Sequence, residues 1–341
     1  MHFADRPGLR RTLVSAVGLR LGVMQMLKNM CWLLGVFAAL FVLAPLWAWA
    51  GEVRVGTWKT AQTIQPFFYE RFFPGTEPVR VFSFTNPADQ KVALLAGSLD
   101  MCGTTLAHAI HSASLGQPVV VVAALCNRSS ALVVKKGGPI KEAKDLKGKK
   151  IGYVPGTMHE ILLRETLARS GLSPDKDVLL TRVDFFDMGM ALAGGGIDAF
   201  LSGEPFPALA VEQGYGQILS YPYYGESIGT INAGMMVTRR SVLERPELVE
   251  RLVLGHAKAT EYLTAHPEEW LKKASTFGTP FQVLQRAAPN MELAWNMDRG
   301  FIRKVQALGE RMQALGLIKK QPQYEELVDL SFVMKVSVKD G

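Results

Sequence analysis

One sequence unit occurs twice in this chain, and it constrains the fold more than any other feature. Residues 93–100 read ALLAGSLD, and residues 191–198 read ALAGGGID. In each copy a small-residue helix end meets glycine, then an apolar residue, then Asp. Glycine suits a helix C-terminus because it adopts the left-handed conformation without a Cβ clash. Two copies predict two similar α/β lobes, and the space between two lobes can enclose a small molecule.

The aspartates that end the two copies, Asp100 and Asp198, invite an acid/base interpretation. We expect structural roles instead, because an Asp beside such a turn fixes the loop through bonds from its side chain to the backbone. The sequence also has no nucleophile elbow, Walker loop or zinc-protease helix motif. We therefore expect a protein that is not an enzyme and that carries no metal or cofactor.

The first fifty residues have the pattern of a secretory leader. Residues 31–47 are almost entirely apolar, Lys28 precedes them, and the small-x-small sequence AWA follows at residues 48–50. The apolar run is short for a membrane span of about 20 residues. We expect a signal peptide over residues 1–50, cleaved after Ala50, with translation starting at one of its later methionines.

The net positive charge of the chain comes largely from this leader. Residues 1–50 hold five of the 38 Lys and Arg and one of the 31 Asp and Glu, so the net charge falls from +7 to +3 without them. No Lys/Arg run is interleaved with aromatic residues, and we expect no nucleic-acid partner. Cys102 and Cys126 could pair in an oxidising compartment, but two buried free thiols are the favoured interpretation.

Strand-like and helix-like segments alternate after the leader, which predicts mostly parallel sheets flanked by helices. One cycle fills residues 51–134, and a second follows a Gly-Gly-Pro linker and fills residues 135–231. A further strand then returns to the first lobe, which residues 232–341 complete. We expect a two-lobed α/β fold with an inserted second lobe, two crossovers, and a hinge near Val134 and Ala233.

A turn between a predicted strand and a predicted helix is the first candidate site. Thr157 can cap that helix, whose first N–H groups would point into the cleft with the positive end of the helix dipole. Such an end favours a sulfonate, carboxylate or nitrate. His159 in the first turn adds a donor, neutral or charged. An ordinary cap and a surface or core-edge histidine are the alternatives.

The first lobe offers matching candidates on the other side of the cleft. Thr104 and Thr105 follow the first copy of the repeated unit, so their hydroxyls should face the cleft unless they only cap a helix. Arg128, near the predicted hinge, could bind an anion bidentately or be a solvated loop residue. Trp58 follows the first predicted strand, at the edge where such sheets bind ligands, although a packing role is as plausible.

Glu204 is the discordant candidate. A carboxylate beside an anion pocket repels the anion unless a cation, a protonated His159 or an amine on the ligand compensates. This favours an amino-sulfonate such as taurine, or an anion accompanied by a metal ion. The alternative is that Glu204 caps a helix or forms an ion pair at the edge facing the hinge.

The chain after the leader resembles a known family over essentially its whole length. The segments KKIGYVPGTMHE (149–160), GLSPDKDV (171–178) and GEPF (203–206) resemble the nitrate/sulfonate/taurine-type substrate-binding proteins of ABC importers. The turn DLKGK (145–149) and the helix start LERPE (243–247) fit the same family. The resemblance implies a two-lobed receptor, periplasmic or lipid-anchored, that closes on a small anion or zwitterion and delivers it to an inner-membrane ABC permease. We expect a periplasmic monomer.

The resemblance also implies pocket positions. The stretches TMHE and GEP are most similar to the nitrate and bicarbonate binders of the family. Carried over position by position, the pocket residues are His159, Thr104, Thr105, Arg128, Ser129 and Ser130. With Trp58, Thr157 and Glu204 they complete the set of candidate ligand-binding residues.

Three other functions remain open at this point. A receptor for a thiamine-pyrimidine precursor or another heteroaromatic would stack its ligand on Trp58, Phe67, Phe68 or Tyr153. An enzyme is possible because family relatives include pyrimidine synthases of the same fold, although their cysteine-rich signature is absent here. A periplasmic sensor subunit would bind the same ligands and contact a signalling protein.

Overall fold

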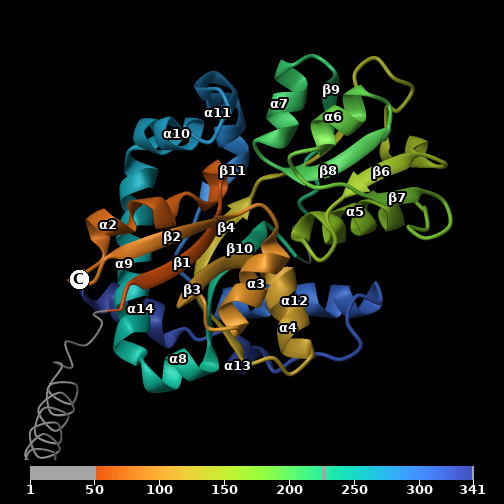
Figure 1. The fold of residues 1–341 in the computed structure, drawn as a ribbon. Coiled ribbons are helices and arrows are strands. Elements are labelled where there is room, and N and C mark those ends of the chain that lie inside the picture. Colours follow the sequence, from red (N-terminus) through yellow and green to blue (C-terminus); the bar gives the residue numbers. More distant parts are fainter. Residues whose placement is uncertain (1–50, 225–227, 340–341) are drawn as a thin grey trace, which may run out of the picture. The chain divides into compact units, whose positions relative to one another are not determined.

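Two β-sheets organise the chain (Figure 1). The computed structural model describes residues 51–224 and 228–339. The signal peptide expected over residues 1–50, and its cleavage after Ala50, lie outside the described residues. Among the helices described, none combines the length and the hydropathy that a membrane span needs.

Lobe 1 is built on a six-stranded sheet with the order β11-β4-β10-β3-β1-β2. Its strands are β1 (Val53–Trp58), β2 (Val79–Phe84), β3 (Met101–Thr105), β4 (Val119–Arg128), β10 (Ile231–Thr238) and β11 (Met291–Leu293). β1 pairs in parallel with β2 and β3, whereas β10 is antiparallel to both β3 and β4.

Lobe 2 is built on a five-stranded sheet with the order β7-β6-β8-β5-β9. Its strands are β5 (Ser130–Lys135), β6 (Lys150–Tyr153), β7 (Leu179–Arg182), β8 (Ala199–Gly203) and β9 (Gly216–Ser220). β6 is parallel to β7 and β8, and β5 is antiparallel to β8 and β9.

The prediction of mostly parallel sheets is therefore wrong, because both sheets are mixed. The reason is the same in each lobe. β10 enters lobe 1 from lobe 2, β5 enters lobe 2 from lobe 1, and each arriving strand inserts in the opposite direction to its neighbours. The two crossovers that define the fold class thus also set the sheet topology.

Helices cover the faces of both sheets. Those of lobe 1 are α2 (Tyr69–Phe72), α3 (Pro87–Leu95), α4 (Leu106–Ser114), α8 (Arg239–Glu244), α9 (Pro246–Ala265), α12 (Arg299–Ala314), α13 (Tyr324–Leu327) and α14 (Ser331–Lys339), with the 3-10 turns η1 (Ala61–Thr63) and η2 (Gln65–Phe68). Those of lobe 2 are η3 (Ala143–Leu146), α5 (Met158–Arg169), α6 (Met188–Ala193) and α7 (Phe206–Glu212).

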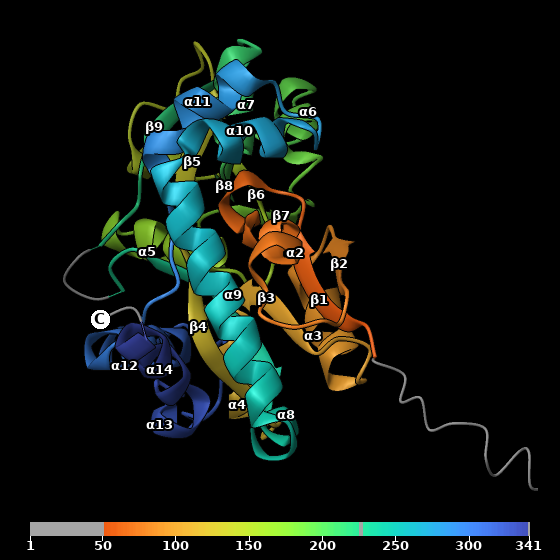
Figure 2. The same cartoon turned by 90° about the vertical axis from the view of Figure 1, so that its left-hand side faces the viewer.

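A helical extension follows the long helix α9, which crosses lobe 1 in Figure 2. It contains α10 (Pro267–Ser275), α11 (Phe281–Ala287) and η4 (Ala288–Asn290). α11 contacts α7 of lobe 2, and β11 then returns the chain to the lobe 1 sheet. The segment after the second crossover therefore touches both lobes.

The repeated unit makes the same backbone contacts in both lobes. The Asp100 carboxylate accepts a hydrogen bond from the Arg54 amide at 2.8 Å, and the Asp198 carboxylate accepts one from the Lys150 amide at 2.9 Å. Each aspartate thereby joins the start of its own strand to the neighbouring parallel strand. The expected structural roles of both aspartates, and the expected duplication, are confirmed.

The first crossover lies at Ser129, between the last residue of β4 and the first residue of β5. Arg128 and Ser129 adopt left-handed conformations with φ of 59° and 76°, which turns the chain sharply from one sheet into the other. We expected lobe 1 to end at residue 134, but the crossover comes earlier. The Gly-Gly-Pro segment, which we interpreted as the linker between the lobes, forms a turn within lobe 2.

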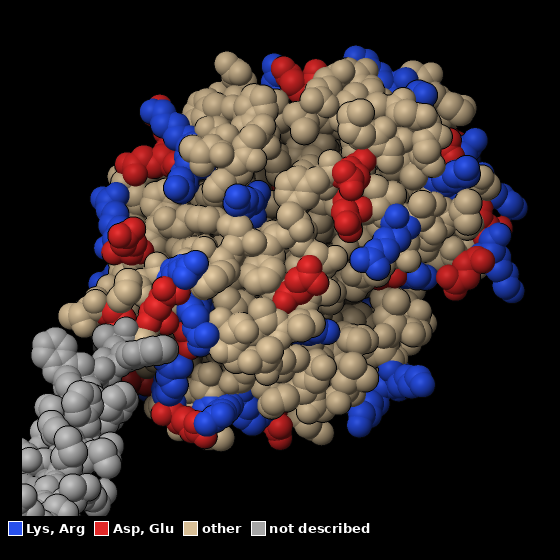
Figure 3. Space-filling view, in the orientation of Figure 1, with Lys and Arg blue, Asp and Glu red and all other residues tan. Residues whose placement is uncertain are grey.

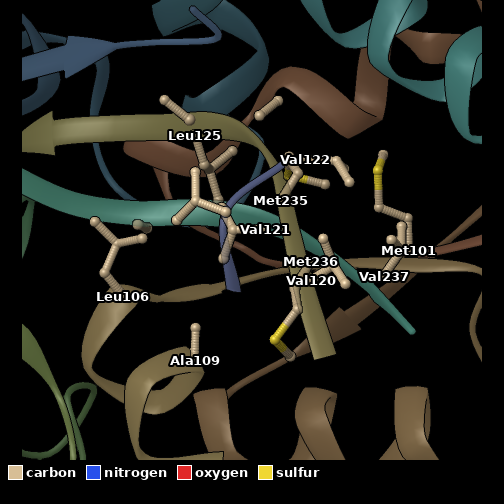
Figure 4. Close-up of a cluster of buried hydrophobic side chains, with 14 of the residues drawn as sticks. Met101, Leu106, Ala109, Val120, Val121, Val122, Leu125, Met235, Met236 and Val237 are labelled. Carbon is tan, nitrogen blue, oxygen red and sulfur yellow. The ribbon is translucent and has the colours of Figure 1, made fainter. Parts of the chain in front are cut away.

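The largest core lies around the central strands of lobe 1. Figure 4 shows Val121 and Leu125 of β4, Met235 of β10 and Leu106 of α4 packed together. β4 is a near-continuous apolar run because helices cover both of its faces. Cys102 and Cys126 are free and buried within this cluster, which confirms the favoured interpretation of the two thiols.

Candidate functional site

A pocket opens between the two lobes at the edge where the parallel strands end. Its space free of atoms measures about 420 Å³, including the part open to solvent. It is lined by Trp58, Thr60, Gln62, Thr85, Thr105, His159, Phe185, Phe186, Gly203, Phe206 and Asn232. Three of the candidates, Trp58, Thr105 and His159, line it together.

The lining combines aromatic walls with neutral polar groups. Phe185 and Phe206 are nearly parallel, with ring centroids 6.1 Å apart, and Phe186 meets Phe206 edge to face at 5.0 Å. No Lys or Arg is among the lining residues. On the face shown in Figure 3, blue and red side chains are interspersed around the molecule, and tan surface predominates between the lobes.

Trp58 is the last residue of β1 and is buried against the pocket. Its indole Nε1 has no hydrogen-bond partner among the described residues. A buried indole N–H without a partner is costly, so this donor is available to a ligand.

Thr105 connects the lobes as well as capping a helix. As the N-cap of α4, its Oγ1 accepts a hydrogen bond from the His108 amide at 3.3 Å. The same hydroxyl donates to the Gly156 carbonyl of lobe 2, also at 3.3 Å. Thr104 is buried next to it, does not line the pocket, and has an Oγ1 with no partner in the described part of the chain.

Thr157 acts as the N-cap of α5, at a helix end that already holds an anion. Its hydroxyl accepts from the Glu160 amide and donates to the Val154 carbonyl. The buried Glu160 carboxylate accepts from the Gly156 amide at 2.7 Å and pairs with Arg164 at 2.9 Å. The protein's own carboxylate thus occupies the position where we expected a ligand anion, and Thr157 does not line the pocket.

His159 projects from the first turn of α5 into the pocket and is only 3% exposed. Burial lowers its pKa to about 3, so the imidazole is neutral at physiological pH. Its Nδ1 hydrogen-bonds Ser130 Oγ at 3.0 Å, and its ring meets Phe185 edge to face at 5.5 Å. Ser130 therefore acts on the pocket through His159.

The side chains of Arg128 and Ser129 lie in different environments, the first in solvent and the second in the interior. Arg128 is exposed and pairs with Glu292 at 3.6 Å, outside the pocket lining. Ser129 is fully buried, and its hydroxyl has no partner within the described ranges. Ser129 Oγ lies next to Gly203, and the Arg128 carbonyl accepts a hydrogen bond from Asn232 Nδ2 at 2.7 Å, so the Arg128 backbone, but not its guanidinium, contacts a pocket residue.

Glu204 lies behind the pocket, at the crossover. Its carboxylate is 1% exposed and accepts from the Ala208 amide of α7 at 3.1 Å and from Asn290 Nδ2 at 3.2 Å. Burial raises its pKa to about 7. Tyr223 donates to both Asn290 Oδ1 and the Ser130 carbonyl, so these groups form one polar cluster that joins lobe 2 to η4.

The sequence reasoning missed most of the remaining lining residues. Thr85 and Gly203 were detectable, because they follow or end parallel strands at the same edge as Trp58 and Thr105. Phe206 stands in the GEPF segment that carried the resemblance. Gln62, Phe185 and Asn232 come from turns and an arriving strand whose positions depend on the assembled lobes.

The family model described as NMT1/THI5 like matches residues 79–270, which contain the lobe 2 site and both crossovers. This is more than half of the chain. The chain belongs to the NMT1/THI5-like family.

Two relatives illustrate the range of the NMT1/THI5-like family. A Brucella abortus protein whose name gives it a binding role is 30% identical over 189 residues, which are 54% of this chain and 57% of the relative. The 4-amino-5-hydroxymethyl-2-methylpyrimidine phosphate synthase of Schizosaccharomyces pombe is 36% identical over 108 residues, 31% of this chain and 30% of that enzyme. The match thus spans little more than half of the first relative.

Solved structures share the fold over most of both chains. The alkanesulfonate-binding protein SsuA of Xanthomonas axonopodis, bound to MOPS, superposes with a TM-score of 0.73 and 21% identity over 82% of this chain and 98% of its own. The nitrate-binding protein NrtA of Synechocystis has a TM-score of 0.72 and 15% identity over 84% and 88%. The two-lobed periplasmic-binding-protein fold of this family member is therefore confirmed.

Proposed function

We propose that this protein is the solute-binding component of an ABC importer and captures a small polar solute between its lobes. The observation that carries the proposal is the pocket itself, to which the strand ends of both lobes contribute. The Thr105 bond to Gly156 joins the lobes beside it. Closure around a solute brings both sets of groups to it and excludes water, which strengthens each polar contact.

The first ligand class is a small anion or zwitterion of the nitrate, sulfonate and taurine type. SsuA and NrtA, which share the fold, are named for alkanesulfonate and nitrate binding. Without Lys or Arg in the lining, binding depends on neutral donors such as Trp58 Nε1 and His159. Neutral donors can hold a monoanion, because a hydrogen bond to an ionised acceptor is shorter and stronger than one between two neutral groups.

A heteroaromatic ligand is the second candidate, and the aromatic lining favours it. Trp58, Phe185 and Phe206 offer faces and edges on which a ring can pack. A synthase of a pyrimidine phosphate is among the relatives. Since that match covers under a third of either chain, we propose binding without turnover, and assays for pyrimidine formation with the purified protein test this directly.

The remaining assignments follow from the transport role. We propose export to the periplasm with removal of residues 1–50, a monomeric receptor, and delivery to an inner-membrane permease. Ligand contacts are assigned to Trp58, Thr105 and His159. Ser129 and Ser130 support them from the crossover.

A thermal-shift screen followed by calorimetry tests the function. Nitrate, taurine, MOPS and 4-amino-5-hydroxymethyl-2-methylpyrimidine are the probes. A probe at about 100 times its Kd should stabilise the protein by about 2.7 kcal/mol and raise the Tm by several degrees. His159→Ala should weaken binding while the unliganded Tm stays near the wild-type value. If none of the four probes shifts the Tm, the proposal is contradicted.

A further inference from the structure

A buried carboxylate on α5 is paired with an arginine from each lobe. Glu165 of this lobe 2 helix is 7% exposed. Its Oε1 accepts a hydrogen bond from Arg169 Nε of the same helix at 2.7 Å. Its Oε2 forms an ion pair with Arg311 Nε of α12, a lobe 1 helix that lies below α5 in Figure 1. The Glu165–Arg311 pair is therefore a charged contact between the lobes, and neither residue is among those that line the pocket.

Helix α5 connects this ion pair to the pocket. His159 lines the pocket from the first turn of the helix, and Glu165 lies further along it. At 1.5 Å per residue the two positions are about 9 Å apart along the helix axis. Leu163 and Leu167 of the same helix are buried in the core of lobe 2, so α5 moves with that lobe. A hinge motion that carries α5 away from lobe 1 therefore separates Glu165 from Arg311 while it opens the pocket.

The second arginine makes this separation reversible. Arg169 and Glu165 both belong to α5, so they stay together when the lobes part. The Arg169 guanidinium also lies 4.3 Å from the centre of the Tyr224 ring, and the Tyr224 hydroxyl hydrogen-bonds Thr166 of α5 at 2.7 Å. A buried carboxylate that loses every counter-charge is strongly destabilised. Because Arg169 remains, opening breaks one ion pair and leaves no uncompensated charge.

We propose that the Glu165–Arg311 ion pair is a latch between the lobes, which favours the closed form and slows the release of solute through helix α5. This inference rests on the proposed function and adds the contact that sets how long the solute is held. Glu165 and Arg311 are positioning residues, because they act through α5 and lie outside the pocket lining. The latch therefore works in the same way for every solute that the pocket accepts.

The first experiment measures solute release from Arg311→Gln, which removes the charge on the lobe 1 side of the latch. The probe is the tightest-binding of nitrate, taurine, MOPS and 4-amino-5-hydroxymethyl-2-methylpyrimidine. Stopped-flow release should be about fivefold faster than from the wild type, with an unchanged association rate. Arg240→Gln is the matched control, because Arg240 Nε pairs with Glu244 at 2.7 Å within a single lobe 1 helix. This control should release the probe at the wild-type rate.

Two further measurements distinguish a latch from an ion pair with a purely structural role. Raising the NaCl concentration from about 0.05 M to about 1 M should speed release from the wild type more than from Arg311→Gln, because salt screens this partly exposed pair. Adding Glu165→Gln to Arg311→Gln should cause no further acceleration, because both residues act through one contact. Arg311→Lys, which keeps the positive charge, should release the probe more slowly than Arg311→Gln.

The separation of the lobes can also be measured without solute. Lys176→Cys in lobe 2 and Lys320→Cys in lobe 1 provide exposed sites for spin labels, whereas the native Cys102 and Cys126 are buried. Pulsed electron paramagnetic resonance then reports the distances between the two labels. The Arg311→Gln variant of this labelled protein should populate longer distances than the labelled wild type.

The outcomes separate the latch from the transport role. If the wild type binds a probe but Arg311→Gln changes neither its release nor the distance between the lobes, the latch is wrong and the proposed function stands. If the wild type binds none of the probes, the proposed function fails, and an unchanged distance between the lobes overturns the latch as well. Should Arg311→Gln fail to fold, Glu165→Gln makes the same test from the lobe 2 side of the pair.

Discussion

The repeated unit leads into a strand in both lobes, but a different type of side chain stands at the end of each strand. In lobe 1, β3 ends on Thr105, whose hydroxyl accepts from an amide in the first turn of α4. In lobe 2, β8 is followed by Glu204, whose carboxylate accepts from an amide in the first turn of α7. The two lobes share the turn and its Asp-to-backbone bond, but a different group caps the helix that follows.

This difference teaches that equivalent positions need not share a function. Thr105 stays neutral and lines the pocket, so it can contact a solute at any pH. Glu204 is buried behind the pocket, and its pKa is raised to about 7. Of the two groups that follow these strands, only Glu204 should therefore change its protonation in the physiological pH range.

The largest expected effect is a pH-dependent stability difference between the wild type and Glu204→Gln. The pKa of Glu204 rises from 4.5 to about 7 on folding, so the folded state favours the protonated acid. That stability is fully present below pH 4.5 and is lost as the pH rises through 7. The loss amounts to about 3 kcal/mol. Urea unfolding at pH 5 and pH 8 should show the wild type losing this stability relative to Glu204→Gln, and parallel curves would contradict the burial argument. Thr105→Ser is the pH-insensitive control.

The two aspartates of the repeat should differ in their contributions. Asp100 is 5% exposed and pairs with Arg245 at 2.7 Å as well as with the Arg54 amide. Asp198 is half-buried and holds the Lys150 amide. Asp100→Asn should cost about 2 kcal/mol and Asp198→Asn about 1 kcal/mol of unfolding free energy. Equal losses would show that the backbone bond common to both copies accounts for the whole effect.

Gly156 tests the contact between the α5 turn of lobe 2 and α4 of lobe 1. Gly156 and Gly171 have φ of 75° and 73°, so alanine costs about 1 kcal/mol of strain at either. At Gly156 the new methyl would also lie 2.4 Å from His108 Nε2, whereas Gly171 faces open space. Gly156→Ala should weaken solute binding about tenfold, since the lobes cannot close fully. Gly171→Ala should leave it unchanged, and adding His108→Ala should restore binding. A persistent defect in that double variant would argue against steric obstruction.

The smallest effects are expected at the two threonine caps. Thr105→Ala and Thr157→Ala each remove an N-cap hydroxyl and should each cost about 1 kcal/mol in thermal or urea unfolding. Only Thr105→Ala should also weaken solute binding in calorimetry, because Thr157 lies outside the pocket and its helix end holds Glu160. Loss of binding in Thr157→Ala would mean that this helix end contacts the solute after all.

Short-range patterns carried most of the successful predictions. The two lobes, the cap at Thr157 and the roles of Asp100 and Asp198 follow from turns and strand starts that each span a few residues. At Thr105 the helix cap was the alternative to a ligand contact, and the structure shows the cap together with a place in the pocket lining. Trp58 was predictable because a parallel strand ends at the ligand edge of its sheet. The mixed strand directions of the two sheets could not be predicted from the sequence. The direction of a strand that crosses from one lobe into the other depends on the path of the chain between the lobes.

By itself the sequence determined the repeated unit, the helix starts and the left-handed glycines, because each depends on bonds between neighbours along the chain. Only the tertiary structure decided that Gln62, Ser129 and His159 meet above Gly203, and that Asn290 reaches Glu204. These groups come from separate elements, and their meeting depends on how two sheets and a helical extension pack. Packing also sets the burial that keeps His159 neutral and raises the pKa of Glu204, so the chemistry of the pocket arises with the assembled fold.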